Sequence, residues 1–160
     1  MNFYEDIYNP AFAAAVSAWL IAQIIKTLSH IIEHRKFSAE RFWGAGGMPS
    51  SHAAAVCGMA TAMAVTEGLN SSLFAVSTLL ALVVMYDASG VRRAAGMHAR
   101  EINHIKRIIE QFNADMRKPG AKTFEETKAH LKELLGHSPF EVFMGALLGI
   151  AIGLLFTIVL

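Results

Sequence analysis

The chain has 160 residues, of which 54% are hydrophobic and only 17% are charged, and its formal net charge is +1. A soluble domain of this length usually carries more charge, and the apolar residues are gathered in blocks, so the composition favours a membrane protein. The single cysteine, Cys57, has no intrachain partner, which excludes a disulfide framework. One domain, residues 1–160, is expected at this length, and no nucleic-acid partner is expected.

Four apolar blocks predict four membrane-spanning helices. The first and last are long enough to cross a bilayer at about 1.5 Å per residue. The middle two cross only if they extend into their flanks or if the bilayer thins. The N-terminus is acidic and lacks the basic region of a cleaved signal peptide, so the first block is expected to be retained. In chain order the blocks are Ala11–Ile32, His52–Thr66, Ser71–Tyr86 and Phe140–Leu160.

The positions of the 14 Lys and Arg residues predict the orientation. None precedes the first span or lies in the turn between the second and third spans. They fall at the end of the first span and in the loop after it, or between the third and fourth spans, two regions that four spans place on one side. The positive-inside rule makes that side cytoplasmic, with both termini outside. The two groups are Lys26, Arg35, Lys36 and Arg41, and Arg92, Arg93, Arg100, Lys106, Arg107, Arg117, Lys118, Lys122, Lys128 and Lys132.

A polar insertion, about residues 94–135, separates the last two spans. Apolar residues recur in it at helical spacing in two runs, and Lys118-Pro119-Gly120 divides the runs. The runs are Ile102, Ile105, Ile108, Ile109 and Phe112, and Phe124, Leu131, Leu134 and Leu135. The predicted fold class is therefore all-α: an integral membrane helical bundle of about four spans, with a cytoplasmic helical hairpin between spans three and four. The basic residues of the hairpin could lie against anionic headgroups.

Small residues predict close packing of the last span on the second. Gly145, Gly149 and Gly153 form two overlapping Gly-x-x-x-Gly patterns, and Ala53–Ala64 is rich in Ala and Gly. Small residues one turn apart let helix backbones approach closely in lipid. Packing alone is a sufficient reason for these glycines, but close contact would also bring together the histidines that begin the two spans.

Several residues that can bind or transfer phosphate converge on one membrane face. Ionisable side chains at membrane depth are costly and usually functional, although Lys26 could equally extend to the interface. The segment Gly46–His52 leads into a helix, whose N-terminus either binds phosphate or carries an ordinary Ser cap. The convergent residues are Lys26, Arg35, Ser50, Ser51, His52, Asp87, Arg92, Arg93, His137 and Glu141.

His137 and Glu141 are four residues apart and would share a helix face. The carboxylate could hold the imidazole in one tautomer and raise its nucleophilicity, or it could simply be a first-turn acid that favours the helix dipole. His30 and His34 have the same spacing, but no third ligand is evident, so no metal site is predicted.

Three ordered motifs resemble the phosphatidic acid phosphatase type 2 superfamily, which also contains the vanadium-dependent haloperoxidases. The similarity is greatest to the divergent bacterial and plastid branch. The motifs are Gly-Gly-Met-Pro-Ser-Ser-His at Gly46–His52, Tyr-Asp-Ala-Ser-Gly-Val-Arg-Arg-Ala-Ala-Gly at Tyr86–Gly96, and Leu-Gly-His-Ser-Pro-Phe-Glu-Val at Leu135–Val142. The resemblance covers nearly the whole chain. It implies a membrane phosphatase of a bacterial inner membrane or a plastid membrane, acting on a phosphomonoester or a lipid (pyro)phosphate.

The resemblance also implies roles for individual residues. His137 would be the nucleophile that forms a phosphohistidine, Glu141 would orient it, and His52 would protonate the leaving oxygen. The phosphate-binding residues would be Lys26, Arg35, Ser50, Ser51, Arg92 and Arg93.

The chain departs from the superfamily pattern at several places: the spacing from Lys26 to Arg35 is two residues too long, and Glu141 stands in place of an aspartate. Lys36 replaces a proline, Ser51 replaces a glycine, and Leu131 stands where an arginine precedes the nucleophile. Arg92 or Arg93 is expected to supply that arginine from beyond the insertion. The usual six-helix fold is shortened here.

The departures keep a second hypothesis open, in which a non-catalytic membrane protein retains an anion pocket that binds a phosphorylated lipid or scaffolds a partner. A transporter has little support, because the spans show no internal repeat, and haloperoxidase activity belongs to soluble relatives. No cofactor is expected. The expected partners are a phosphorylated small molecule or lipid and membrane lipid, and four small spans would suit a homodimer.

Overall fold

The structure is a computed structural model that describes residues 8–35, 47–116, 131 and 136–158. Within these ranges the chain forms helices and no strands, which confirms the predicted all-α membrane bundle. Three helical segments are long and apolar enough to cross a membrane: Pro10–Ile32, Ser72–Phe112 and Pro139–Ile158. The helices are α1 (Pro10–His34), α3 (Ser51–Thr66), α4 (Ser72–Ser89), α5 (Val91–Asp115) and α6 (Pro139–Ile158).

Local sequence determines where the helices begin. Asn9 caps α1, because its side-chain oxygen accepts a hydrogen bond of 2.9 Å from the backbone N–H of Phe12, and Pro10 occupies the first turn. Ser50 and Ser71 cap α3 and α4 in the same way. The helices therefore start within two residues of the predicted apolar blocks. At 16 residues, α3 is about 24 Å long and shorter than the hydrocarbon core of a bilayer.

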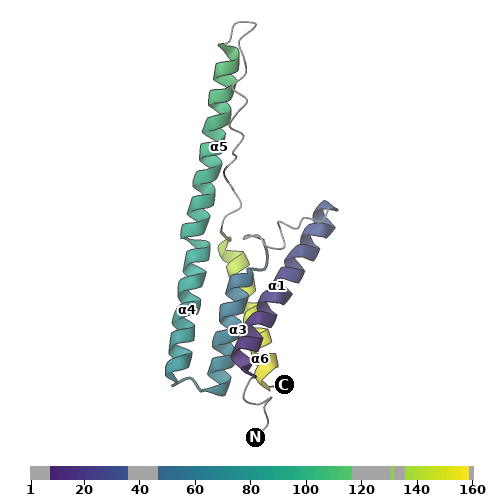
Figure 1. The fold of residues 1–160 in the computed structure, drawn as a ribbon, viewed down its shortest axis with the longest axis vertical. Helices are drawn as coiled ribbons and strands as arrows, with labels where there is room; N and C mark the ends of the chain where they lie inside the picture. The colour runs from purple at the N-terminus through teal and green to yellow at the C-terminus, as the bar shows by residue number, and fades with distance from the viewer. Residues whose placement is uncertain (1–7, 36–46, 117–130, 132–135, 159–160) are drawn as a thin grey trace.

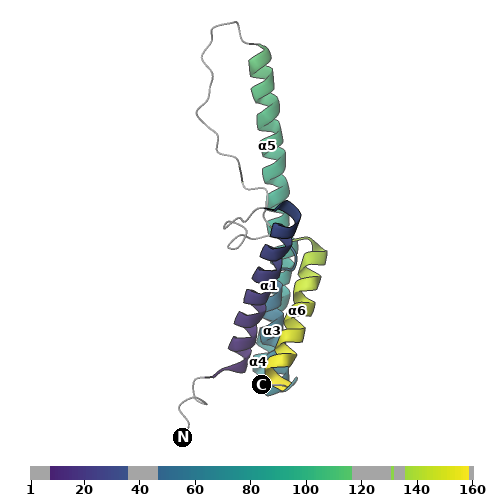
Figure 2. The ribbon, with the colours of Figure 1, turned by 90° about the vertical axis from the view of Figure 1, so that its right-hand side faces the viewer.

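The helices alternate in direction (Figures 1 and 2). α1 and α4 run one way, and α3 and α6 run the other. α1 therefore begins, and α6 ends, at one end of the bundle. At the opposite end α3 and α6 begin and α4 passes into α5.

Glycine backbone forms the seam between α3 and α6. A Cβ added at Gly149 would collide with the carbonyl oxygen of Ala54, and one at Gly153 would lie 2.7 Å from the carbonyl oxygen of Gly58. Only residues without a side chain permit this approach. The predicted packing of the last span on the second is confirmed.

α1 joins the same core through a stripe of alanines. Ala11, Ala14, Ala18 and Ala22 recur at helical spacing and are 2% exposed or less. Gly58 of α3 lies where three helices meet, because a Cβ there would be 3.3 Å from atoms of α1 and of α6. Large apolar side chains cover the outer faces of the bundle and remain exposed, as expected for contact with lipid.

α5 continues α4 and projects beyond the bundle (Figure 1), with only Gly90 between the two helices. The first helix of the predicted hairpin is therefore a 25-residue extension that begins at Val91. Leu131 lies alongside α5, because Asn103 exchanges two hydrogen bonds, of 2.9 and 3.1 Å, with the backbone of Leu131. Leu131 itself is not helical. The remainder of the predicted second helix lies at 117–130 and 132–135, outside the described residues.

Candidate functional site

Two histidines meet at the end of the bundle where α3 and α6 begin. The ring centroids of His52 and His137 are 6.2 Å apart, and the ring planes are inclined at 73°. His52 is the second residue of α3, whereas His137 lies two residues before α6. Residues 85 positions apart in the chain are adjacent because the glycine seam holds the two helices together.

The segment before α6 is anchored to the junction of α4 and α5. The backbone N–H of His137 donates a hydrogen bond of 3.0 Å to the carbonyl oxygen of Ala88. Gly136 has a φ of +82°, and a Cβ there would collide with the backbone nitrogen of Arg93 and lie 2.6 Å from the carbonyl carbon of Arg92. Sequence analysis missed this anchor, although a glycine directly before a candidate nucleophile was a signal for it.

The imidazole of His137 is buried without a hydrogen-bond partner. The residue is 2% exposed, and neither ring nitrogen forms a hydrogen bond to the part of the chain that the structure describes. Buried polar groups are nearly always hydrogen-bonded, and an unpaired one is costly. These two nitrogens are therefore candidates for bonds to a ligand.

The surroundings of His137 keep its ring neutral at physiological pH. Burial is the largest effect and lowers the pKa to about 4, from an ordinary value of 6.5. The carboxylate of Glu141 opposes this shift, whereas the charges of Lys26, His52 and Arg92 add to it. A neutral imidazole has the free lone pair that a nucleophile requires.

Lys26 extends the buried face of α1 toward the two histidines. It lies four residues after Ala22, on the same face of the helix, and is only 4% exposed. A Cβ on Gly47, whose φ is +90°, would be 3.0 Å from Cδ of Lys26. Gly47, shortly before α3, therefore packs against the aliphatic part of the Lys26 side chain. Lys26 also acts electrostatically on both histidines.

The first residues of α3 are tied to α6. Ser50 and Ser51 are 0% and 1% exposed. The hydroxyl of Ser50 accepts a hydrogen bond from the backbone N–H of Ala53, and its own N–H donates one of 3.0 Å to the carbonyl oxygen of Glu141. The Ser50 cap does not exclude phosphate binding by the N-terminus of α3. The first N–H groups of any helix have no intrahelical partner, and the cap engages only that of Ala53.

Glu141 forms a capping box with Ser138. Its carboxylate accepts a hydrogen bond of 2.7 Å from the Ser138 N–H, and its own N–H donates one of 3.3 Å to the Ser138 hydroxyl. The argument that His137 and Glu141 share a helix face was wrong, because α6 begins at Pro139 and His137 precedes its cap. Glu141 acts on His137 electrostatically, and its role in orienting the imidazole stays a prediction.

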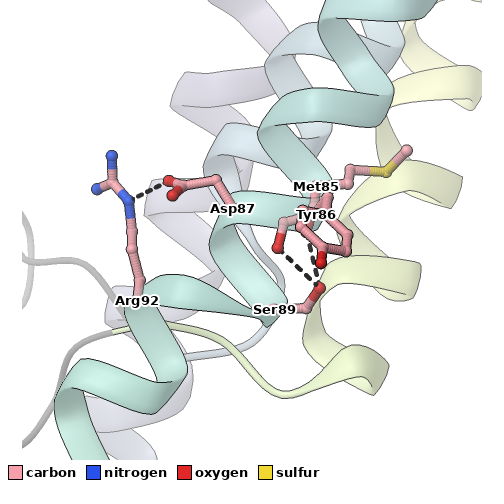
Figure 3. Close-up of polar contacts among 5 residues, drawn as sticks. All are labelled: Met85, Tyr86, Asp87, Ser89 and Arg92. Carbon is pink, nitrogen blue, oxygen red and sulfur yellow. Dashed lines mark hydrogen bonds and ion pairs between the residues drawn. The ribbon is translucent and has the colours of Figure 1, made fainter.

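Arg92 lies near the histidines but is held by an acidic neighbour. Its Nε is 2.6 Å from Oδ2 of Asp87, and Figure 3 shows the two side chains pointing toward each other across the α4–α5 junction. The side chains of Arg92 and Asp87 are 54% and 42% exposed. In the same figure Ser89 donates a hydrogen bond of 2.8 Å to the carbonyl oxygen of Met85, one turn earlier. Because an ion pair as exposed as this one contributes little to stability, Arg92 can turn from Asp87 toward a bound anion at small cost.

The other two predicted arginines differ in their placement. Arg93 contributes its backbone to the contact with Gly136, and its side chain is exposed. Arg35 ends α1 in a left-handed conformation with a φ of 52° and is also exposed. It lies nine residues beyond Lys26, about 13 Å farther along the helix axis. The structure thus gathers Lys26, Ser50, Ser51, His52, Arg92, His137 and Glu141, and it leaves Arg35 apart.

Comparisons with known proteins show the family of this chain. A family model described as the divergent PAP2 family matches residues 7–152. "Uncharacterized membrane protein YuiD" of Bacillus subtilis (strain 168) is 41% identical over 150 residues, which cover 94% of this chain and 95% of that protein. No solved structure matches the chain. With its three motifs meeting at one end of an apolar helical bundle, the chain belongs to the divergent PAP2 family of membrane proteins.

Proposed function

We propose that this protein is a membrane-bound phosphohydrolase that acts on a phosphomonoester or a lipid (pyro)phosphate through a phosphohistidine on His137. The observation that carries the proposal is the buried ring of His137, whose two nitrogens have no hydrogen-bond partner among the described residues. It lies beside a second histidine and within electrostatic reach of Lys26 and Arg92. Membership of the divergent PAP2 family agrees with this chemistry.

The reaction takes two displacements. A ring nitrogen of neutral His137 attacks phosphorus, the ester P–O bond breaks, and His52 donates a proton to the departing oxygen. His52 then accepts a proton from a water molecule whose oxygen attacks phosphorus. The P–N bond breaks, and inorganic phosphate leaves. Lys26, Arg92 and the first N–H groups of α3 stabilise the charge on the three equatorial oxygens in both steps.

Access to the nucleophile requires movement. His137 is 2% exposed, so a phosphoryl group reaches its ring only when covering groups withdraw. His52 is exposed and marks the side from which a substrate would enter. The positive charges of Lys26 and Arg92 would attract an anion to the ring of His137, because electrostatic attraction is strong where water is excluded.

The site is proposed to face the cytoplasm, with both termini on the other side. Every Lys and Arg that the structure describes lies in the last third of α1, at its end, or in α5, which places them at the site end of the bundle or beyond. The positive-inside rule assigns such an end to the cytoplasm. Labelling of introduced cysteines with a membrane-impermeant reagent, in intact and in permeabilised cells, would test this orientation.

Phosphate release by the detergent-solubilised protein tests the proposal. The substrates are lipid phosphates, prenyl diphosphates and a chromogenic ester, and the variants are His137→Ala and the control His104→Ala, which changes an exposed histidine of α5. Release that is lost in His137→Ala but normal in His104→Ala is expected. Normal release by folded His137→Ala would refute the nucleophile assignment.

A second function is favoured by the ion pair between Arg92 and Asp87 and by the capping box that engages Glu141. With these two groups occupied, the same pocket could bind a phosphorylated lipid without turnover. That function predicts binding of phosphate or vanadate that depends on Lys26 and His137, with no phosphate released from any of the substrates.

A further inference from the structure

α5 carries a continuous apolar stripe that is exposed along its length. The stripe residues are between 50% and 72% exposed. Another face of the same helix is covered, because Asn103 is 2% exposed and pairs with Leu131. The stripe consists of Ile102, Ile105, Ile108, Ile109 and Phe112, with Met116 directly after the end of the helix. Soluble surfaces rarely expose an apolar patch of this extent without a partner.

The spacing of the stripe is that of a coiled-coil seam. Five of its members, Ile102, Ile105, Ile109, Phe112 and Met116, are separated alternately by three and four residues, an average of 3.5, and Ile108 widens the stripe at a g position. This period gives two adjoining helices a shared left-handed supercoil with apolar residues at the a and d positions. Val91 and Ala95 continue the same register toward the bundle, with His98 as its single polar member. The opposite face is polar, with Arg100, His104, Arg107 and Gln111 exposed.

We infer that α5 associates in parallel with α5 of a further copy of this chain. α4 lies within the apolar bundle and leads into α5 with only Gly90 between them. All copies inserted in one membrane therefore project α5 in the same direction, and neighbouring copies meet in parallel. The membrane also confines them, which raises their effective concentration.

Charges beside the seam fit the parallel arrangement. Glu101 precedes the a-position Ile102 and so occupies a g position, and Lys106 occupies the following e position. In a parallel pair the g residue of one helix faces the next e residue of the other. Glu101 of one copy would therefore face Lys106 of another, on both sides of the seam. Isoleucine at both a and d also suits three strands.

A lipid surface is the competing occupant. An amphipathic helix that binds lipid headgroups lies flat in the interface, whereas α5 continues the direction of α4 away from the bundle (Figure 1). The spacing of the stripe is also found in helices that bind lipid, so the direction of α5 is what separates the two occupants. The geometry therefore favours a second copy, and lipid becomes an outcome of the test.

Disulfide crosslinking in native membranes tests the inference. Cys57→Ala removes the single cysteine of the chain, and Ile109→Cys or the control Gln111→Cys is then added. Both positions are exposed, so both variants are expected to fold. Oxidation should link Ile109→Cys at least about tenfold faster than Gln111→Cys, because only the seam brings paired residues within disulfide distance.

A charge variant provides the second measurement. The pair Ile105→Asp and Ile109→Asp should reduce the mass of the detergent-solubilised protein to that of a monomer, while His104→Asp with Gln111→Asp should leave an oligomer. Equal crosslinking at the two positions, or a monomeric mass for the unmodified chain, would overturn the inference. Slow crosslinking of Ile109→Cys, with quenching of a fluorophore there by nitroxide lipids, would assign the stripe to lipid instead.

Discussion

Replacing Gly149 with alanine tests the seam between α3 and α6, on which the meeting of the two histidines depends. The new Cβ would collide with the carbonyl oxygen of Ala54 and lie 2.9 Å from the backbone nitrogen of Gly58. Both are backbone atoms of a helix, so no side-chain rotation relieves the collision. Ordinary contact begins at 3.4 Å, so the Gly58 nitrogen alone must recede by about 0.5 Å.

The cost follows from that displacement. A gap of about 0.5–1 Å forfeits a quarter to a half of the dispersion attraction between the atoms it separates. Overpacking of this kind typically costs ~1–3 kcal/mol. For a chain of this size each kcal/mol lowers Tm by about 2–4 °C, so Gly149→Ala should lower Tm by roughly 2–12 °C.

Thermal unfolding of the detergent-solubilised protein, followed by tryptophan fluorescence, measures this change. Ala151→Val is the matched control, because it adds bulk to an exposed position of the same helix. Its Tm should stay within about 1 °C of the parent value, since exposed substitutions have small effects. A Tm for Gly149→Ala that is unchanged, or lowered no more than that of the control, would refute the account of the seam.

Three further predictions concern the residues around the nucleophile. His137 should titrate near pH 4, not 6.5, in histidine-labelled NMR assigned with His137→Gln. Because the unfolded chain takes up this proton at higher pH, stability should fall between about pH 6.5 and pH 4, and a titration at or above 6.5 would contradict the burial argument. Gly136→Ala should cost roughly 1–3 kcal/mol of unfolding free energy, because of its φ of +82° and the collision with Arg93, and an unchanged Tm would exclude this contact. Asp87→Asn breaks the ion pair to Arg92 but should cost less than about 1 kcal/mol, since both side chains are about half exposed, and a larger loss in Tm would show that the pair is structural.

Much of the fold could be predicted from local patterns. The apolar blocks mark the four helices of the bundle, and their alternating direction follows from the short turn at Glu67 and from the grouping of basic residues. The close approach of α3 and α6 could be predicted because glycine at every fourth residue has few other uses in a membrane helix. The meeting of His52 and His137 follows from that approach.

The finer geometry could not be predicted, because it depends on where each helix begins. The spacing of His137 and Glu141 indicates a shared face only inside a helix. Pro139 favours the first helical position, where its missing N–H costs nothing, so α6 starts after the histidine. The carboxylate then binds the Ser138 N–H.

Long-range backbone contacts also escaped sequence analysis. The hydrogen bond from the His137 N–H to the Ala88 carbonyl oxygen joins two segments that are far apart in the chain. No periodicity or motif in the sequence predicts such a contact. The insertion between the third and fourth spans was predicted to form a helical hairpin, but the pattern did not show that its first helix, α5, continues α4 with only Gly90 between them.

Isolation of the phosphorylated intermediate tests the central claim most directly. The protein would be mixed with a substrate that it hydrolyses, quenched in alkali, which preserves phosphohistidine, and digested for mass spectrometry. The account predicts phosphate on the peptide that contains His137, with no label in His137→Gln. Phosphate on a different residue, or hydrolysis that continues in His137→Gln, would contradict it.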